Sequence, residues 1–539
     1  MMLLRRLELW AQKYPDKKLV VQIDKDLSIT KSITVSSLLR RVQQFAYTLR
    51  QYNGKCLLLL FLPDEAINFL VAFLACLYAG VIAVPLIPPS NVHDCKKMQY
   101  VIQDCNAQGI LTSVAYYCTS WYLFPRERWP TMHIETTYPC CRIMKAPCVH
   151  EVAFLQYTSG STSNPKGVSI SHQALDANLE WSRGFLTERY KGNKICSVTW
   201  VPFYHDYGLT SLLNAIYSVD LGSIIMMSPL TFIKHPLSWL KALSKFKATH
   251  TQGPNFAYSH CVKHARIYPD QVKDIDLSNM RQFSMGGEMV RYATIQSFCD
   301  TFGVNPQNMD PSYGMAEMVC GFMHASMVRC IQVQLDRNKV VCKDKGNVYV
   351  SVGQPGPTQR VLIVDANDEA VEKDTVGEIM LHGPSMMSGY YHQAPNFLTV
   401  DGVSFVRSGD LGFLHDGHLY VCGRKKAVII VNGRNVFAAD VENVVLETCG
   451  QYLRAGAIAA VAIDDGTKEH LCIVAEVKMS SFLDASSRSV IHSCIRRAVF
   501  TSMHLTVHQI CLLAKHSLEK TSSGKLQRYK YKQDNFYGH

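Results

Sequence analysis

Residues 158–167 read Thr-Ser-Gly-Ser-Thr-Ser-Asn-Pro-Lys-Gly, and this stretch decides how the rest of the chain is interpreted. Glycines allow a backbone to approach a ligand closely with its N–H groups turned inward. The hydroxyls can donate to phosphate oxygens, and Lys166 adds a mobile positive charge. Strand-like residues flank the stretch on both sides, whereas a Walker loop opens a helix. The stretch therefore predicts a triphosphate cradle, although plain surface turns share this composition.

Beyond this loop, strand-like runs alternate with helical patterns through most of the chain, which indicates an α/β fold with largely parallel sheets. Residues 66–79 predict a buried helix, and residues 81–84 predict a buried strand. Gly80 and Pro85 interrupt this apolar run, which argues against a membrane span. Short strands and turns between residues 346 and 380 predict a β-rich subdomain, and a compact α+β segment is expected after Gly423.

The composition narrows the class of protein. A chain of 539 residues is too long for one core, and 47% hydrophobic with 18% charged residues is typical of an ordinary soluble globular protein. The formal net charge is +11, but no basic-aromatic stripe accompanies it, which argues against a nucleic-acid partner. The nineteen cysteines include no C-x-x-C pair, so we expect reduced core residues. Without a signal-peptide pattern, the expectation is a cytoplasmic protein, with a monomer as the default.

Four further motifs follow the loop: Tyr313–Glu317 (Y-G-M-A-E), Ser408–Asp410 (S-G-D), Gly423–Lys426 (G-R-K-K) and Thr521–Lys525 (T-S-S-G-K). In order and spacing the five motifs resemble the signatures of the adenylate-forming superfamily, the acyl- and aryl-activating ligases. The resemblance covers nearly the whole chain. It implies a large N-terminal adenylation domain of α/β subdomains plus the β-rich subdomain (residues 1–422). It also implies a hinge (residues 423–427) and a small mobile α+β C-terminal lid domain (residues 428–539).

The resemblance implies ATP and Mg²⁺ as cofactors and assigns residues to them. The triphosphate would be held by Thr158, Ser159, Gly160, Ser161, Thr162 and Lys166. Mg²⁺ would lie beside Thr162 and Glu317, since this ion takes only one or two carboxylates and keeps several waters. Further nucleotide contacts are implied for Gly287, Glu288, Ser312, Gly314, Met315 and Ala316.

The remaining roles concern the ribose, the base and the reacting groups. The resemblance implies that Tyr313 stacks on adenine and that Asp410 accepts both ribose hydroxyls, with Arg424 as its partner from the hinge. It places His205 beside the acyl carboxylate and Lys525 on the carboxylate and α-phosphate oxygens. Lys525, His205 and Glu317 are therefore the expected catalytic residues. His205 is not expected to act as a general base, because a carboxylate nucleophile is already ionised at neutral pH.

Several local stretches resemble the fatty acyl-AMP ligases in particular: Cys76–Pro89, Trp200–Leu209 and Gly253–Tyr258. The chain between Glu317 and Gly353 is also long and contains strand-prone runs at residues 331–335 and 339–341. This segment is similar to a family insertion that is thought to restrain domain rotation and to disfavour CoA. The resemblance implies that a fatty acid and ATP give acyl-AMP and pyrophosphate. The acyl group would then pass to the phosphopantetheine of an acyl carrier protein or of a carrier domain in a polyketide or peptide synthase.

The chain departs from the family pattern at Ala427, where Asp is usual, at Ala438, where Pro is usual, and at residues 285–289, which read M-G-G-E-M. These changes bear on domain rotation and transfer more than on adenylation. Three alternatives stay open: a fatty acyl-CoA ligase, a non-catalytic acyl- or nucleotide-binding homologue, and an amino-acid-activating domain. The basic segment 515–532 suggests a docking surface for an acidic carrier, with Arg528 and Lys530 as its test positions.

Overall fold

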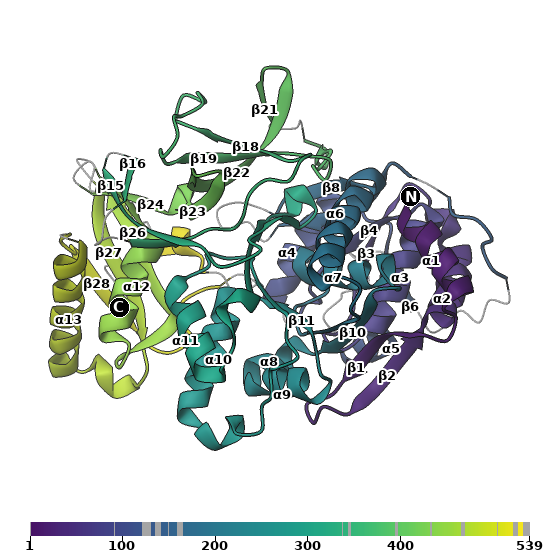
Figure 1. The fold of residues 1–539 in the computed structure, drawn as a ribbon, viewed down its shortest axis with the longest axis horizontal. Coiled ribbons are helices and arrows are strands. Elements are labelled where there is room, and N and C mark those ends of the chain that lie inside the picture. The colour runs from purple at the N-terminus through teal and green to yellow at the C-terminus, as the bar shows by residue number, and fades with distance from the viewer. Residues whose placement is uncertain are drawn as a thin grey trace.

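The computed structural model describes residues 2–90, 92–120, 131–134, 142–148, 150–158, 165–336, 338–342, 347–393, 397–431, 434–464, 469–503, 505–520 and 526–531. Figure 1 shows a large lobe that carries the N-terminus and a smaller lobe formed by the end of the chain. Within the described ranges, every helix is too short or too polar to cross a membrane.

One half of the large lobe is built on a seven-stranded sheet (Figure 1). In spatial order its strands are β20 (Gly389–Tyr390), β8 (Gly167–Ser171), β7 (Val152–Tyr157), β4 (Ile82–Pro85), β3 (Cys56–Leu60), β5 (Gly109–Thr112) and β6 (Thr131–Ile134). The predicted helix is α3 (Ala66–Ala79), which ends at the left-handed Gly80 and leads into β4. This confirms the prediction of a buried helix followed by a buried strand, because every residue of β4 and nearly all of α3 are buried.

The other half is built on an eight-stranded sheet whose central strands are parallel. Its order is β14 (Gly321–His324), β13 (Met309–Gly314), β12 (Gln282–Met285), β11 (His250–Gly253), β9 (Ile195–Thr199), β10 (Gly222–Met227), β1 (Lys18–Ile23) and β2 (Ile29–Thr34). Because parallel strands carry their carboxyl ends at one edge, the loops that follow β9, β11, β12 and β13 meet there.

Helices fill three layers around the two sheets. The largest core lies between the sheets and contains α1 (Met2–Lys13), α2 (Val35–Leu49), α3, α6 (His172–Tyr190) and α7 (Asp206–Tyr217). The outer face of the seven-stranded sheet is covered by α4 (Val92–Asp104) and α5 (Val114–Ser120). The outer face of the eight-stranded sheet is covered by α8 (Pro229–Lys234), α9 (Leu237–Lys245), α10 (Asn255–Ile267) and α11 (Tyr292–Phe302). Such a layered arrangement is expected when helices connect parallel strands.

The β-rich subdomain predicted from the sequence is confirmed. Its sheet contains β18 (Arg360–Val364), β19 (Gly377–His382), β21 (Phe397–Val400), β22 (Val403–His415) and β23 (His418–Arg424). The strand-prone insertion also forms strands: β15 (Cys330–Asp336), β16 (Lys339–Cys342) and β17 (Asn347–Val350). The insertion packs on the subdomain, since Val333 and Tyr349 share an apolar cluster with Phe413 and Tyr420.

The C-terminal lobe has a core of its own. It consists of β24 (Val428–Val431), β25 (Arg434–Phe437), α12 (Ala438–Cys449), β26 (Leu453–Asp464), β27 (Glu469–Val477), α13 (Ala485–Met503) and β28 (Gln509–Leu513). Between β23 and β24 the chain makes one short turn at Lys425–Ala427. The separate core favours the predicted division at residues 423–427, and that division stays a prediction.

The two lobes meet at the start of α12. Arg291 Nη2 donates to the carbonyl oxygen of Ala439 at 3.0 Å, and Asn347 Nδ2 donates to Asp440 Oδ2 at 3.2 Å. Burial raises the pKa of Asp440 to about 6, although Arg291 opposes this shift. Asp440 therefore becomes ionised only near pH 6 in the folded protein, at a pH about two units higher than in an unfolded chain.

This shift predicts a pH-dependent stability. Between pH 4 and pH 6 the folded protein binds more protons at Asp440 than the unfolded chain, so this residue's contribution to the free energy of unfolding falls as pH rises. Asp440→Asn should remove that loss, so the variant should gain on the order of 2 kcal/mol relative to the wild type between pH 4 and pH 7. Urea unfolding at both pH values measures this, with the exposed Asp300→Asn as control. Parallel pH profiles for wild type and Asp440→Asn would contradict the prediction.

Candidate functional site

The hairpin of β22 and β23 places Asp410 directly opposite Arg424. Arg424 Nε lies 2.9 Å from Asp410 Oδ1, and Arg424 Nη1 donates to the carbonyl oxygen of Ser408 at 2.9 Å. The Asp410 charge raises the pKa of Arg424, so the pair is ionised. Ser408, which stands where the family more often has Thr, donates to the carbonyl oxygen of Ile379 and accepts from the Asp410 N–H. The hydroxyl of this position thus fixes the turn that presents Asp410.

Tyr313 joins the same carboxylate from the end of β13. Its hydroxyl donates to Asp410 Oδ2 at 2.8 Å, and burial together with the Asp410 charge raises the Tyr313 pKa far above its usual value. The structure therefore brings the predicted adenine, ribose and hinge residues into one hydrogen-bonded group.

Glu317 lies one short turn further along the chain and is buried. Its Oε1 accepts from the Tyr390 hydroxyl at 2.9 Å, and its carbonyl oxygen accepts from the Met387 N–H at 2.8 Å. Burial is the main cause that raises the Glu317 pKa, and the charge of Asp206 adds to it. Lys166 Nζ lies 4.8 Å from the centre of the Tyr390 ring. Tyr390 thus links the predicted phosphate lysine to the predicted metal carboxylate.

The ends of the phosphate loop come together at the mouth of the β7–β8 hairpin, where the Thr158 N–H donates to the carbonyl oxygen of Lys166 at 3.1 Å. Ser159, Gly160, Ser161 and Thr162 lie outside the described residues, as does Lys525. Their predicted contacts with phosphate, Mg²⁺ and the reacting carboxylate stay predictions.

At two positions beside the site, the backbone lies so close to a neighbouring segment that only glycine fits. A side chain at Gly314 would place its Cβ 1.8 Å from the carbonyl oxygen of Cys320, and one at Gly286 would lie 2.5 Å from Ser312 Oγ. Ser312 Oγ donates to the Met285 carbonyl oxygen at 3.0 Å, while Met315 and the buried Ala316 connect β13 to Glu317. The left-handed Gly287 lies beside Tyr207. These residues shape the backbone around Tyr313 and Glu317.

Gly314→Ala is therefore expected to displace Tyr313 and Glu317 and to reduce ATP–pyrophosphate exchange by at least tenfold, since the new methyl group meets backbone that cannot move aside. Gly184→Ala is the matched control because an added Cβ there meets nothing within 4 Å. This change on α6 should leave exchange unchanged and raise stability by about 0.5–1 kcal/mol. Equal exchange rates for the two variants would show that the close approach at Gly314 is unimportant.

Glu288 is hydrogen-bonded to the start of α10. Its Oε1 accepts from the Phe256 N–H at 2.6 Å, in the first turn of α10, where a negative charge is favoured by the helix dipole. Glu288 thus has a structural partner on α10, and its predicted nucleotide contact stays a prediction.

His205 caps the N-terminus of α7, where its ring accepts from the Tyr207 N–H. Its Nδ1 lies 2.5 Å from Asp206 Oδ1. Asp206 is a residue that the sequence reasoning missed: its side chain is only 13% exposed, and its charge reaches Glu317. The only signal was its place inside the Tyr204–Gly208 run.

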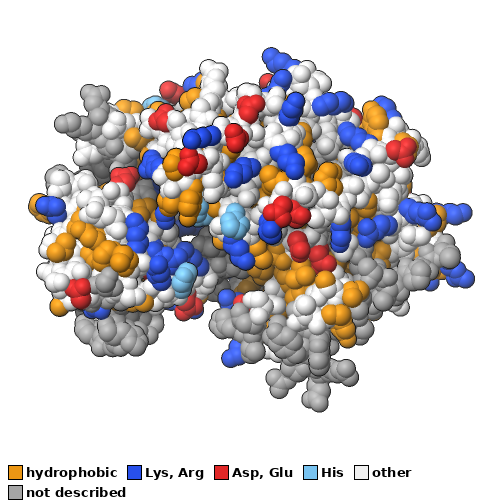
Figure 2. Space-filling view, turned by 90° about the horizontal axis from the view of Figure 1, so that it is seen from below, with side chains coloured by type: hydrophobic (Ala, Val, Ile, Leu, Met, Phe, Trp, Pro, Cys, Tyr) orange, Lys and Arg blue, Asp and Glu red, His pale blue; other side chains and the backbone are white. Residues whose placement is uncertain are grey.

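A hollow between the two lobes is lined by positive charge. Figure 2 shows Lys and Arg side chains gathered along the hollow where the C-terminal lobe faces the large lobe. A positive hollow suits an anionic ligand such as a nucleotide triphosphate. Not all of the basic C-terminal segment is free for a partner, however. Arg528 forms a bidentate pair with Glu442 (2.6 and 2.7 Å), and Lys530 is paired with Glu519, so the expected docking charges are already engaged within the lobe.

Comparisons with known proteins identify the family of this chain. Residues 7–391 match the family of AMP-binding enzymes. The chain is 35% identical to the medium-chain-fatty-acid–[acyl-carrier-protein] ligase JamA of Moorena producens, over 87% of this chain and 84% of that protein. It is 30% identical to the putative fatty-acid–CoA ligase FadD21 of Mycobacterium tuberculosis, over 95% and 94% of the two chains.

The chain is also similar to solved structures of fatty acyl-adenylate ligases. A structure from a study of fatty acyl-adenylate ligases of E. coli and L. pneumophila superposes with a TM-score of 0.86 at 26% identity, over 98% of this chain and 97% of the other. The L. pneumophila fatty acyl-adenylate ligase in complex with acyl adenylate and pyrophosphate is 31% identical, with a TM-score of 0.73 and coverage of 98% and 95%. This chain belongs to the AMP-binding enzymes and, within them, to the fatty acyl-AMP ligases.

Proposed function

We propose that this protein activates a fatty acid with ATP to acyl-AMP and then passes the acyl group to the phosphopantetheine thiol of an acyl carrier protein. The observation that carries the proposal is the joined group of Tyr313, Asp410 and Arg424, with Glu317 and Lys166 linked through Tyr390. In this group Asp410 would accept hydrogen bonds from the ribose, Glu317 is a buried carboxylate, and Lys166 is a cation that would contact the phosphates. A relative whose name states ligation to acyl carrier protein supports the choice of acceptor.

In the first step a carboxylate oxygen attacks the α-phosphorus of ATP, and pyrophosphate leaves. The enzyme assists mainly by positioning and by placing cations near the phosphate oxygens. Asp410 would hold the ribose, and Arg424 would keep that carboxylate oriented. Lys166 would lie against the phosphates, and Lys525 against the reacting oxygens. In the second step the carrier thiolate attacks the acyl carbon and AMP leaves, so no covalent intermediate with the protein is needed.

Mg²⁺ fits the residues at Glu317. The carboxylate is buried, is raised in pKa by burial and by Asp206, and has one oxygen not used by Tyr390. A divalent cation offsets the repulsion between two neighbouring carboxylates. Mg²⁺ needs only one or two carboxylate ligands. Glu317, with Thr162 from the phosphate loop, would hold the ion. Bound Mg²⁺ would neutralise charge that develops on the phosphates.

The test is transfer of a labelled fatty acid with MgATP, offered free CoA and phosphopantetheinylated carrier protein in parallel. Acyl-AMP that persists with CoA and is consumed by the carrier supports the proposal. Efficient acyl-CoA formation would instead assign the protein to the acyl-CoA ligases. If no acid of any chain length gave acyl-AMP, the proposed first step would be wrong, and the non-catalytic alternative would gain support.

A further inference from the structure

The helices α12 and α13 of the C-terminal lobe (Figure 1) share one apolar core. One face of α12 is buried at every third or fourth position: Ala438, Val441, Val445 and Cys449. The buried residues of α13 are Ile491, Ile495, Ala498 and Val499. Cys494 follows Ile491 by three residues and therefore lies beside the same face of α13. The packing of the two helices thus brings Cys449 and Cys494 to one contact.

The two thiols meet at this contact. Cys449 Sγ lies 2.6 Å from Cys494 Sγ, although the two residues are 45 positions apart in the sequence. Both are free cysteines in this structure. The sulfurs of a disulfide are ~2.05 Å apart, so these two atoms need to approach each other by only ~0.5 Å to bond. The backbones of α12 and α13 therefore already hold the pair within reach of a covalent bond.

The two thiols differ in their access to solvent. Cys449 ends α12 and is fully buried, whereas Cys494 is only half-buried on α13. Burial raises the pKa of Cys449, the neighbouring Cys494 thiol adds to this shift, and Arg497 opposes it. Because the attacking species in thiol exchange is a thiolate with access to the reagent, a reagent from solvent reacts with Cys494 first. Cys449 is then the second thiol, which lies too deep to meet the reagent itself.

We propose that Cys449 and Cys494 form a redox-active dithiol that a small disulfide such as oxidised glutathione converts to a disulfide bond. The Cys494 thiolate attacks one sulfur of oxidised glutathione, the glutathione S–S bond breaks, and one glutathione thiolate leaves. Cys449 then loses its proton and attacks the Cys494 sulfur of this mixed disulfide, and the second glutathione thiolate leaves. Each leaving thiolate takes up the proton that the attacking cysteine released. Two protein thiols are thus oxidised, and one glutathione disulfide is reduced to two thiols.

The bond would connect the end of α12 to the middle of α13 across β26 and β27. A cross-link over a segment of this length stabilises a fold mainly because it restricts the unfolded chain. The effect is confined to the C-terminal lobe, since both cysteines belong to its core. Oxidation is therefore expected to raise the melting temperature of this lobe by ~5 °C or more.

The first experiment uses the wild-type protein in a series of mixtures of reduced and oxidised glutathione. After alkylation of the remaining thiols, trypsin releases residues 435–454 and 489–496, and each of these peptides contains one cysteine. Mass spectrometry should find the two peptides linked under mixtures in which Cys511 is still alkylated, and dithiothreitol should separate them. Cys511 is the reference because it is also half-buried and belongs to the same lobe. Cys494 that carries glutathione without a link to Cys449, or that stays reduced until Cys511 reacts, would overturn the inference.

The second experiment compares Cys494→Ser with the matched control Cys511→Ser. The control should keep both the linked peptide pair and the rise in melting temperature with oxidised glutathione. Cys494→Ser should lose both, and its Cys449 should stay reduced because the reagent cannot reach it. An equal rise in melting temperature in Cys494→Ser would overturn the inference. Neither experiment uses ATP or a fatty acid, so the result does not depend on the proposed function.

Discussion

Asp410→Asn is expected to lower kcat/KM for acyl-AMP formation by about a hundredfold or more. The carboxylate is paired with Arg424, accepts from Tyr313 and is the proposed ribose acceptor. Neutralising it leaves the Arg424 charge without its partner and removes two charge-assisted bonds to the ribose; charge-assisted bonds contribute about 1.5–3 kcal/mol each. ATP–pyrophosphate exchange at varied ATP measures this, and the loss should appear in both KM for ATP and kcat.

Asp368→Asn is the matched control for this change. Asp368 also pairs with an arginine, Arg407, but its side chain is more exposed than that of Asp410 (40% against 11%). Its left-handed backbone (φ 66°) is one that Asn adopts readily. The control should therefore keep wild-type exchange. If Asp410→Asn behaved like Asp368→Asn, the Asp410–Arg424 pair would be structural only.

Glu317→Gln is expected to reduce adenylation by about 10²–10³-fold, comparable with the loss of one preorganised electrostatic contact to a transition state. The substitution keeps the shape of the side chain and removes the charge proposed to hold Mg²⁺. The apparent Mg²⁺ affinity, measured by exchange at varied metal, should fall together with the rate.

Tyr390→Phe provides the comparison for Glu317→Gln. It removes only the hydrogen bond to Glu317 Oε1 and keeps the ring beneath Lys166, so a loss below tenfold is expected. A wild-type dependence on Mg²⁺ in Glu317→Gln would remove this residue from the proposed metal site.

Local sequence patterns were sufficient to predict several elements. The run from Ala66 to Ala79 is apolar throughout and ends at a glycine, and it forms a buried helix with the same bounds. The insertion strands were predicted at residues 331–335 and 339–341 and are observed at Cys330–Asp336 and Lys339–Cys342. In these cases the deciding interactions are short-range periodicity and residue preference, which a sequence displays directly.

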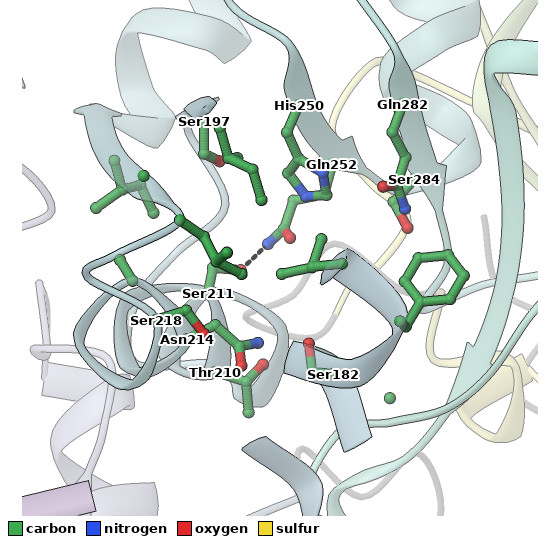
Figure 3. Close-up of a pocket in the computed structure, with 18 of the residues that line it drawn as sticks. Ser182, Ser197, Thr210, Ser211, Asn214, Ser218, His250, Gln252, Gln282 and Ser284 are labelled. Carbon is green, nitrogen blue, oxygen red and sulfur yellow. Dashed lines mark hydrogen bonds between the residues drawn. The ribbon is translucent and has the colours of Figure 1, made fainter. Parts of the chain in front are cut away.

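Other parts of the site depend on contacts between distant segments. Tyr390 reaches Glu317 from a strand 73 residues away and belongs to none of the motifs. A pocket between α7 and β12 (Figure 3) is lined by residues of both elements, so no single stretch of sequence reveals it. The sequence suggests Arg528 as part of a docking surface, and it does not reveal the pairing with Glu442, which is 86 residues away. Tertiary packing, and not local preference, decides each of these cases.

Asp410 and Arg424 face each other on one hairpin, and the connection to the C-terminal lobe begins at the very next residue. A swivel of the chain within Lys425–Ala427 would therefore leave both partners where they are, since the strand ladder holds them on the large lobe. The ribose of the nucleotide would thus stay bound to Asp410 while the C-terminal lobe rotates and presents a different surface to the site. In such an enzyme the product of the first half-reaction would stay anchored during the changeover.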